Sequence, residues 1–365
     1  MSEFDHFVGT RAVPTQHAFD APALQRWLTA NLEGFEGPLT AELFQGGQSN
    51  PTYKLITPTR SYVMRSKPGP SARLLPSAHA IEREFAVMRA LADTDVPVPR
   101  MLALCEDEAV IGRAFYVMEF KQGRVLWDQA LPGMTAGERA AIYDEMNRVI
   151  AALHSVDYRA SGLADFGRPG NYFERQIGRW SKQYRASETR PIEAMHRLME
   201  WLPDNIPASA SDADLSAIVH GDYRMDNLMF AHDATAVVAV LDWELSTIGH
   251  PFADFSYHCM SWHIPSGVFR GIADLDLPAL GIPDEQSYIR RYCERTGFAS
   301  VEQLTADWNF YLAYNMFRLA AILQGIAKRA EQGLASSARA KLQGENAAPL
   351  AEMAWRKAQQ SSVGR

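Results

Sequence analysis

One polar segment between two apolar runs constrains the fold of this chain more than any other stretch. Residues 219–230 read as a strand, a loop and a second strand, and Asp222 and Asn227 bracket the loop. The apolar run 236–241 is expected to form a third strand and ends at Asp242. A carboxylate at the end of a buried strand is costly unless it is paired or binds a metal. The segment therefore predicts functional carboxylates and an amide at these turns.

The spacing of these polar residues matches a known catalytic pattern. Protein kinases carry H-R-D-L-x-x-x-N and then D-F-G, in which the first Asp accepts the proton of the substrate hydroxyl and the Asn and second Asp hold magnesium. His220, Asp222 and Asn227 keep this spacing, and Asp242 follows one hairpin later, although Gly replaces the Arg and Trp-Glu replaces Phe-Gly. H-G-D-x-x-x-x-N followed by L-D-W-E resembles the aminoglycoside phosphotransferase and choline kinase family, the small-molecule branch of the kinase fold.

The resemblance implies a fold and a set of cofactors. The expected class is α+β, a bilobal protein-kinase-like fold with an antiparallel sheet in the nucleotide-binding lobe, residues 1–120, and a mainly helical lobe, residues 121–365, that carries the catalytic loop and the acceptor site. The expected cofactors are ATP and Mg²⁺. The resemblance makes Asp222 the catalytic residue and Asn227 and Asp242 the metal ligands.

Composition excludes several other classes of protein. The chain has 365 residues, enough for two lobes, and a net charge of −7 without a basic block, so nucleic-acid binding is not expected. No apolar run approaches the roughly 20 residues of a membrane helix, and the acidic start of the chain does not resemble a signal peptide. Three scattered cysteines, Cys105, Cys259 and Cys293, favour buried reduced thiols in a cytoplasmic protein.

The first part of the chain predicts an extended arm, a helix and a small sheet. After the arm, residues 1–19, Asp20 is expected to cap a helix that ends near Gly34. Three strands should follow, over 39–44, 52–56 and 62–65.

The turn between the first two of these strands, residues 45–51, is rich in glycine. Its backbone N–H groups could cover the phosphates of a nucleotide, although a plain hairpin turn is the alternative. The residues concerned are Gly46, Gly47, Ser49 and Asn50.

A cation on the third strand is expected to orient the α- and β-phosphates. Compared with the kinase motif V-A-I-K, Arg65 takes the place of the lysine, and Lys67 is the alternative. In the helix expected over 77–92, Glu84 lies at the edge of the apolar face, whereas Glu82 points elsewhere. An inward carboxylate needs a cation, so an Arg65–Glu84 ion pair is predicted.

A rigid Val-Pro-Val-Pro segment, residues 96–99, precedes two further strands over 101–105 and 114–120. The resemblance implies that the second of these strands leads into the hinge between the lobes, where backbone groups bind adenine; a plain sheet strand is the alternative. The expected nucleotide contacts are Met118, Glu119, Phe120 and Lys121.

The remainder should be mainly helical. His154 is expected to pack structurally rather than to catalyse, and the last helix is expected to be polar and to pack or to form a homodimer. Helices are predicted over 135–154, near 171–186 and 189–202, and over 284–292, 301–330 and 334–360.

Further polar residues receive supporting or acceptor roles. His220 and Asp254 are expected to support the catalytic loop. His250, His258 and His263 lack the spacing of a metal site. The acceptor-site candidates are Glu244, Arg175, Arg179 and Trp180, although a solvated basic helix face is an equal alternative for any one arginine.

The resemblance implies an ATP-dependent phosphotransferase that acts on a hydroxyl of a small molecule. Segments 62–69, 80–85, 96–99 and 241–244 are similar to a subgroup that is fused to, or encoded beside, acyl-CoA dehydrogenases. That similarity implies a hydroxyacyl-CoA acceptor, such as a 4-hydroxyacyl-CoA, and the mixture of Arg, Lys and aromatics over 171–200 suits an anionic acceptor.

Three alternatives remain. One is a kinase of aminoglycosides, amino alcohols or sugars, and another is a nucleotide-binding pseudokinase that serves as a scaffold. A protein kinase is disfavoured, because no A-P-E follows Asp242 and Asp254 arrives within a dozen residues.

Overall fold

The computed structural model describes residues 9–45, 50–69, 80–211, 214–333 and 344–361. By its internal contacts the chain divides into two compact units. Unit 1 contains residues 1–127 and 226–246, and unit 2 contains residues 128–225 and 247–365. The hairpin that follows the catalytic loop therefore groups with the N-terminal part of the chain. A single division at residue 120 would instead assign this hairpin to the C-terminal lobe.

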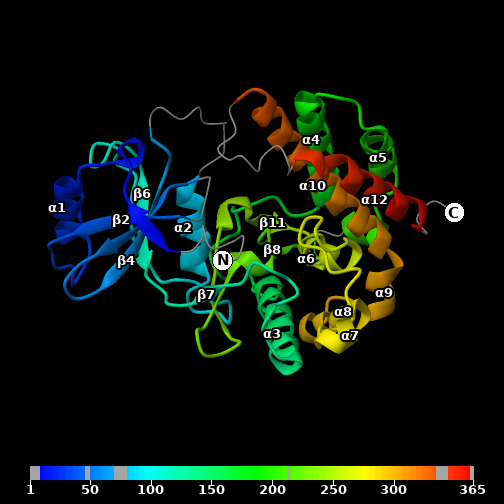
Figure 1. Cartoon of the computed structure of the whole chain (residues 1–365), viewed down its shortest axis with the longest axis horizontal. Coiled ribbons are helices and arrows are strands. Elements are labelled where there is room, and N and C mark those ends of the chain that lie inside the picture. The colour runs from blue at the N-terminus through cyan, green and yellow to red at the C-terminus, as the bar shows by residue number, and fades with distance from the viewer. Residues whose placement is uncertain (1–8, 46–49, 70–79, 212–213, 334–343, 362–365) are drawn as a thin grey trace. The chain divides into compact units, whose positions relative to one another are not determined.

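Unit 1 contains a six-stranded antiparallel sheet (Figure 1). Its strand order is β1-β2-β3-β4-β6-β5. The five strands predicted here are confirmed, and β1 lies in the segment that was expected to be an extended arm. The strands are β1 (Thr10–Ala12), β2 (Thr40–Phe44), β3 (Thr52–Ile56), β4 (Ser61–Ser66), β5 (Met101–Cys105) and β6 (Phe115–Glu119).

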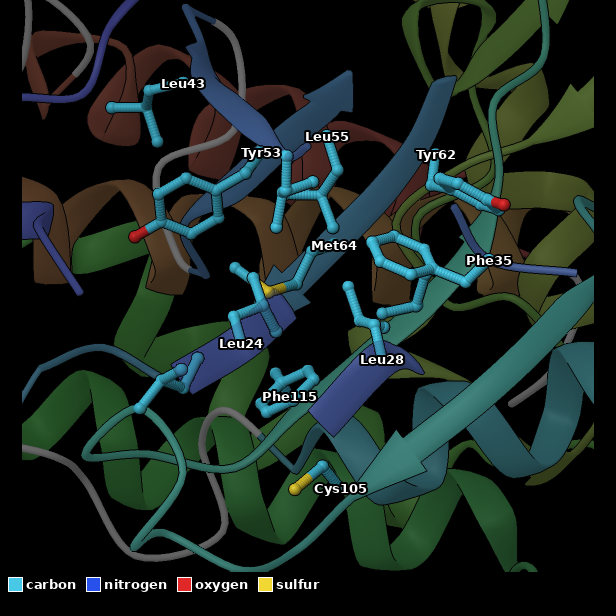
Figure 2. Close-up of a cluster of buried hydrophobic side chains, with 13 residues drawn as sticks. Leu24, Leu28, Phe35, Leu43, Tyr53, Leu55, Tyr62, Met64, Cys105 and Phe115 are labelled. Carbon is cyan, nitrogen blue, oxygen red and sulfur yellow. The ribbon is translucent and has the colours of Figure 1, made fainter. Parts of the chain in front are cut away.

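Helix α1 (Ala21–Asn31) covers one face of this sheet. Asp20 caps it as predicted, since its carboxylate accepts a hydrogen bond of 2.8 Å from the Ala23 N–H. Leu24 and Leu28 are fully buried among sheet side chains, and each contributes about 1.5–3 kcal/mol of apolar burial. Figure 2 shows this cluster, in which the sheet residues include Tyr53, Leu55, Tyr62, Met64 and Phe115.

Helix α2 (Ile81–Ala90) covers the other face (Figure 1). Side chains alternate along β4, so Tyr62 and Met64 belong to the cluster below α1 while Arg65 points towards α2. Phe85 of α2 packs against the ring of Tyr116 on β6, with ring centroids 6.2 Å apart. Strand alternation thereby separates an apolar face from one that carries charge.

A second, three-stranded sheet completes unit 1, with strand order β10-β9-β7. Its strands are β7 (Arg124–Val125), β9 (Leu228–Phe230) and β10 (Val237–Val240). The β9–β10 hairpin was predicted, whereas the two-residue β7 was not.

Unit 2 is mainly helical, as predicted. The helix expected over 301–330 is interrupted at Asp307, and the last helix is amphipathic rather than polar, because Leu350 and Ala354 are buried. A short sheet pairs β8 (Ala217–Val219) with β11 (Thr247–Gly249). The helices are α3 (Ala136–His154), α4 (Tyr172–Ser187), α5 (Glu193–Asp204), α6 (Pro251–Cys259), α7 (Leu277–Leu280), α8 (Glu285–Thr296), α9 (Val301–Ala306), α10 (Trp308–Glu331) and α12 (Ala347–Gln359).

Two expectations about the whole chain can be compared with the described residues. All three cysteines are free thiols and buried, as predicted. Among the helices of the described segments, none combines the length and the apolar character needed to cross a bilayer.

Candidate active site

Arg65 is the centre of a charged cluster in unit 1. Its Nε lies 3.0 Å from Glu84 Oε2, and its Nη2 lies 2.7 Å from Asp242 Oδ1 and 3.8 Å from Glu244 Oε2. The Nε–Oε2 contact is an ion pair rather than an aligned hydrogen bond. Burial alone would lower the pKa of Arg65, but the carboxylates of Glu84 and Asp242 raise it above its ordinary value. The guanidinium therefore stays charged, and the predicted Arg65–Glu84 pair is present.

Glu84 is held by neutral donors as well. Its side chain is buried, Asn50 Nδ2 donates to Oε1 at 3.0 Å, and the Tyr116 hydroxyl donates to Oε2 at 3.1 Å. By contrast, Lys67 pairs with Glu82 at 3.3 Å, and both side chains are partly exposed. Arg65 and Lys67 were the two candidates for the cation that orients the phosphates. Arg65 lies in the buried cluster, and Lys67 lies at the surface.

Asn227 and Asp242 leave the same end of the β9–β10 hairpin. The register pairs Val240 with Leu228, and the Leu241 N–H donates to the Asn227 carbonyl at 2.8 Å. Asp242 has a φ of 65°, a left-handed conformation that is uncommon for residues other than glycine and typical of functional sites. Pairing within the hairpin therefore brings the Asp242 carboxylate and the Asn227 amide, which are separated by a turn and two strands in the sequence, to the same end of the hairpin.

This donor set fits a hard divalent cation that is completed by phosphate oxygens. Mg²⁺ is usually bound by one or two carboxylates together with substrate phosphates rather than by an all-protein cage. The guanidinium of Arg65 already places positive charge 2.7 Å from the Asp242 carboxylate. Within the described segments, no group of three or more His, Cys, Asp or Glu side chains is arranged to hold a metal.

The predicted catalytic residue, Asp222, lies in unit 2, and both of its carboxylate oxygens are engaged. The Tyr257 hydroxyl donates to Oδ1 at 2.6 Å, and Arg224 Nη2 lies 3.2 Å from Oδ2. Burial and the nearby Asp222 carboxylate raise the pKa of Tyr257, so its hydroxyl keeps its proton and acts as a donor. Asp222 is thus a carboxylate held in one orientation.

Asp254 fixes the backbone of the loop that carries Asp222. One oxygen accepts the N–H of His220 at 2.7 Å and the other accepts the N–H of Gly221 at 2.9 Å. His154 Nε2 lies 3.3 Å from the same carboxylate, and its Nδ1 lies 2.7 Å from the Tyr292 hydroxyl. Burial alone would raise the pKa of Asp254, but these hydrogen bonds and the neighbouring histidines lower it. The supporting contacts expected of Asp254 are therefore present, and His154 is buried beside it.

Replacing Asp254 with Ala is expected to lower the free energy of unfolding by about 2–5 kcal/mol, because two buried N–H groups lose their acceptor. The pKa of Asp254 is lower in the folded state than in the unfolded state. The stability that this pKa shift contributes is therefore fully present above the ordinary carboxyl pKa of about 3.9, and it is lost as the pH falls through the folded-state pKa. Urea unfolding should therefore separate wild type and variant at pH 7 and show a smaller gap near pH 3.

The control for this experiment is Asp276→Ala, which removes a helix-capping carboxylate at the surface and should cost only about 1 kcal/mol. Equal losses in the two variants would contradict the supporting role of Asp254.

Arg318 of α10 supports the same loop from inside unit 2. It is buried and donates to the Gly221 carbonyl. Its guanidinium lies 5.0 Å from the ring centroid of Tyr257 and 5.6 Å from that of Trp180. Trp180, an acceptor-site candidate, is therefore nearly buried in the packing below the loop.

The other acceptor-site candidates lie in different surroundings. Arg175 donates to the backbone carbonyls of Gly170 and Arg168, so it ties the start of α4 to the preceding loop. Arg179 lies 5.4 Å from the ring centroid of Trp180. Glu244 belongs to the Arg65 cluster of unit 1. Their roles in acceptor binding stay predictions.

The segment predicted to be the hinge follows β6. The Glu119 N–H already donates to the Arg100 carbonyl at 2.9 Å, and its carboxylate pairs with Lys121 at 3.0 Å. Met118 faces its partner Val63 in the sheet register. Lys54 Nζ lies 4.7 Å from the ring centroid of Phe120. Gly46, Gly47 and Ser49 of the predicted phosphate-covering turn lie outside the described residues, and Asn50 contacts Glu84.

Sequence reasoning missed three side chains around Asp222. Arg224 lies inside the recognised motif but received no role. Tyr257 follows Asp254 by one helical turn, a spacing that places both on one face of α6. Arg318 is the single charged residue in the apolar stretch 308–327 of α10, which signals a buried interaction.

Comparisons with known proteins identify the family. The model of the phosphotransferase enzyme family matches residues 40–296. A protein of Ralstonia eutropha, named a "putative aminoglycoside phosphotransferase", has a solved structure that is 62% identical with a TM-score of 0.86, covering 94% of this chain and 100% of that one. Mouse acyl-CoA dehydrogenase family member 10 is 47% identical over 349 residues, which are 95% of this chain and 32% of the mouse protein.

More distant structures show the fold. Choline kinase from Cryptosporidium parvum superposes with a TM-score of 0.63 at 13% identity, covering 93% of this chain and 96% of the kinase. The predicted kinase-like α+β class is therefore confirmed. The chain spans only 32% to 44% of the length of mouse acyl-CoA dehydrogenase family members 10 and 11. The family match covers well over half of the sequence, and the chain belongs to the phosphotransferase enzyme family.

Proposed function

We propose that this chain transfers the γ-phosphoryl group of ATP to a hydroxyl of a small molecule. The observation that carries the proposal is Asp222, a carboxylate oriented by Tyr257 and Arg224 on a loop that Asp254 holds. In the reaction the acceptor oxygen forms a bond to the γ-phosphorus, the bond from that phosphorus to the bridging oxygen breaks, and ADP leaves. The hydroxyl proton passes to the Asp222 carboxylate. Family membership supports this reaction class.

Residues of unit 1 are proposed to bind the nucleotide. Arg65, oriented by Glu84, would bind the α- and β-phosphates. The backbone of the turn that contains Gly46, Gly47, Ser49 and Asn50 would cover the phosphates. Backbone groups of Glu119, Phe120 and Lys121 would bind adenine beside Met118, and the free N–H groups needed here would come from beyond Glu119, whose N–H is already bonded.

Asn227 and Asp242 are the residues that would hold Mg²⁺. When bound, the ion would offset phosphate charge as phosphoryl transfer proceeds. The protein itself would accelerate the reaction by positioning the reactants and by stabilising charge in the transition state, because phosphoryl transfer needs little covalent chemistry from side chains. Arg65 has to exchange part of its contact with Asp242 for contact with phosphate oxygens.

The proposed acceptor is a hydroxyacyl-CoA, such as a 4-hydroxyacyl-CoA. The curated relatives of 40% identity or more include proteins named as acyl-CoA dehydrogenase family members, of which this chain matches one part. A kinase-like segment joined to such a protein suits an acyl-CoA substrate. An aminoglycoside or amino-alcohol acceptor is the alternative, supported by the name of the Ralstonia eutropha relative and by the choline kinase fold.

The test is ATP consumption with Mg²⁺ and three acceptors, 4-hydroxybutyryl-CoA, choline and kanamycin, with product mass measured for each. We expect ATP-dependent addition of one phosphoryl group to the thioester and much slower reaction with the two cations. Preference for choline or kanamycin would favour the alternative. Nucleotide binding without transfer to any acceptor would favour a pseudokinase scaffold.

Two wider proposals accompany this function. The buried free cysteines support a cytoplasmic location. A homodimer also stays a proposal, and the apolar face of α12 does not require one, because Leu350 and Ala354 are already buried within unit 2.

A further inference from the structure

A lysine, a histidine and a glutamate form a hydrogen-bonded chain in unit 2, and the proposed phosphotransfer uses none of the three. Lys357 lies in α12, His263 ends the 3₁₀ helix η6 (Met260–His263), and Glu285 begins α8. Lys357 Nζ lies 2.9 Å from His263 Nδ1, and His263 Nε2 lies 2.7 Å from Glu285 Oε1. Three elements that are distant in the sequence therefore join an amine to a carboxylate through an imidazole.

The chemistry of the three groups fixes the direction of these hydrogen bonds. An ammonium group has donors only, so His263 Nδ1 accepts from Lys357. The proton of the neutral imidazole then lies on Nε2 and is donated to Glu285. The Trp308 indole N–H donates to the same carboxylate oxygen at 3.0 Å, which helps to hold Glu285 in place. His263 is thus oriented with the lone pair of Nδ1 towards the lysine nitrogen.

Lys357 is less basic than an ordinary lysine. Burial lowers its pKa, and the nearby carboxylate of Glu285 opposes this effect only in part. A larger fraction of its amine is therefore neutral, and hence nucleophilic, at a given pH. The side chains of Lys357, His263 and Glu285 are all partly exposed, so a reagent in solution can reach them.

We propose that Lys357 is a site of N-acylation by acyl thioesters, with His263 as the proton acceptor and Glu285 as the residue that positions it. A nucleophile beside a base, with a third group that orients the base, is the general arrangement that activates nucleophilic side chains. After the ammonium has lost one proton to solvent, the amine attacks the thioester carbonyl carbon. A C–N bond forms, the C–S bond breaks and a thiolate leaves. The second nitrogen proton passes to His263 Nδ1 and from there to the thiolate or to water.

A thioester suits this site better than an oxygen ester does. A thiol has a pKa of about 8.5, so it leaves as a thiolate without help from an acid, and a single proton acceptor is sufficient. An alkoxide would need a proton as it leaves. The inference does not depend on the proposed phosphotransfer, because neither a nucleotide nor a hydroxyl takes part in the acylation.

The test incubates the full chain with acetyl-CoA near pH 8, without ATP, and follows the acetylation of each lysine by peptide mass spectrometry. We expect Lys357 to react about 100-fold faster than Lys182, an exposed lysine of α4, which is the lower end of the range contributed by a positioned proton acceptor. The rate at Lys357 should also rise at a lower pH than the rate at Lys182, because the pKa of Lys357 is lowered.

Variants identify the base. His263→Asn keeps an oxygen near the position of Nδ1 that can accept from Lys357 but cannot take up a proton, so acetylation should fall to the rate of an exposed lysine. Glu285→Gln keeps a hydrogen-bond acceptor without the charge and should lower the rate by a smaller factor. His196→Gln disrupts another His–Glu pair of unit 2, in α5, and is the matched control that should behave as wild type.

Equal rates at Lys357 and Lys182 in wild type would overturn the inference, and so would an unchanged rate at Lys357 in His263→Asn. Loss of acetylation in His263→Asn but not in the control supports it, provided that thermal unfolding shows both variants to be folded. If His263→Asn does not fold, the wild-type pH profiles decide, and identical profiles for the two lysines reject the inference. Phosphotransfer is measured with ATP and a hydroxyl acceptor, so failure of either proposal is recognised separately.

Discussion

Replacing Asp222 with Ala is expected to lower kcat by roughly 10²- to 10⁴-fold, the range contributed by a positioned proton acceptor. The affinity for ATP should stay close to that of wild type, because the Arg65–Glu84 cluster is built from other residues. Steady-state kinetics with the best acceptor and fluorescence titration with a nucleotide analogue would measure the two quantities separately. A variant that keeps the wild-type kcat would reject the role of Asp222.

Two further variants sharpen this prediction. Asp222→Asn keeps the side-chain size and an oxygen for the Tyr257 hydroxyl but cannot accept the proton, so it should be nearly as impaired as Asp222→Ala. Asp233→Asn removes an exposed carboxylate in the β9–β10 turn and should leave kcat unchanged. A large loss in Asp222→Ala with little loss in Asp222→Asn would assign Asp222 to orientation of the hydroxyl rather than to proton transfer.

Motif comparison and helical spacing were sufficient for the charged cluster of unit 1. Comparison with the kinase motif V-A-I-K selected Arg65, and helical spacing placed Glu84 inward and Glu82 outward, as the structure has them. Both inferences use neighbours within one element. The cap Asp20 is equally local, since its side chain accepts a hydrogen bond from the N–H three residues later.

Contacts between distant parts of the chain could not be predicted in the same way. The Tyr257–Asp222 and Arg318–Gly221 contacts join residues that are 35 and 97 positions apart, and periodicity contains no information about such pairs. Strand β1 was missed because three residues give too short a pattern, and its pairing with β2 decides its conformation.

Asp242→Asn is the second change with a large expected effect. Asn tolerates the left-handed backbone observed at φ 65°, so the substitution removes charge while the loop conformation can persist. The neutral amide is a poorer ligand for a divalent cation, and Arg65 keeps Glu84 and Glu244 as partners. We expect a higher free Mg²⁺ concentration at half-maximal rate and a kcat lowered by roughly 10²- to 10³-fold, the loss typical of removing one group that stabilises transition-state charge.

The measurement for Asp242→Asn is the initial rate as a function of free Mg²⁺ at saturating ATP. Glu82→Gln is the matched control, because it removes a carboxylate that pairs with Lys67 at the surface of the same unit. If both variants keep the wild-type dependence on Mg²⁺, Asp242 serves only to hold Arg65. In that case Asp242→Asn should still lower the melting temperature, since a buried guanidinium loses one of its carboxylates. Loss of the Mg²⁺ response with an unchanged melting temperature would instead show that Asp242 binds the metal and that its ion pair with Arg65 does not stabilise the fold.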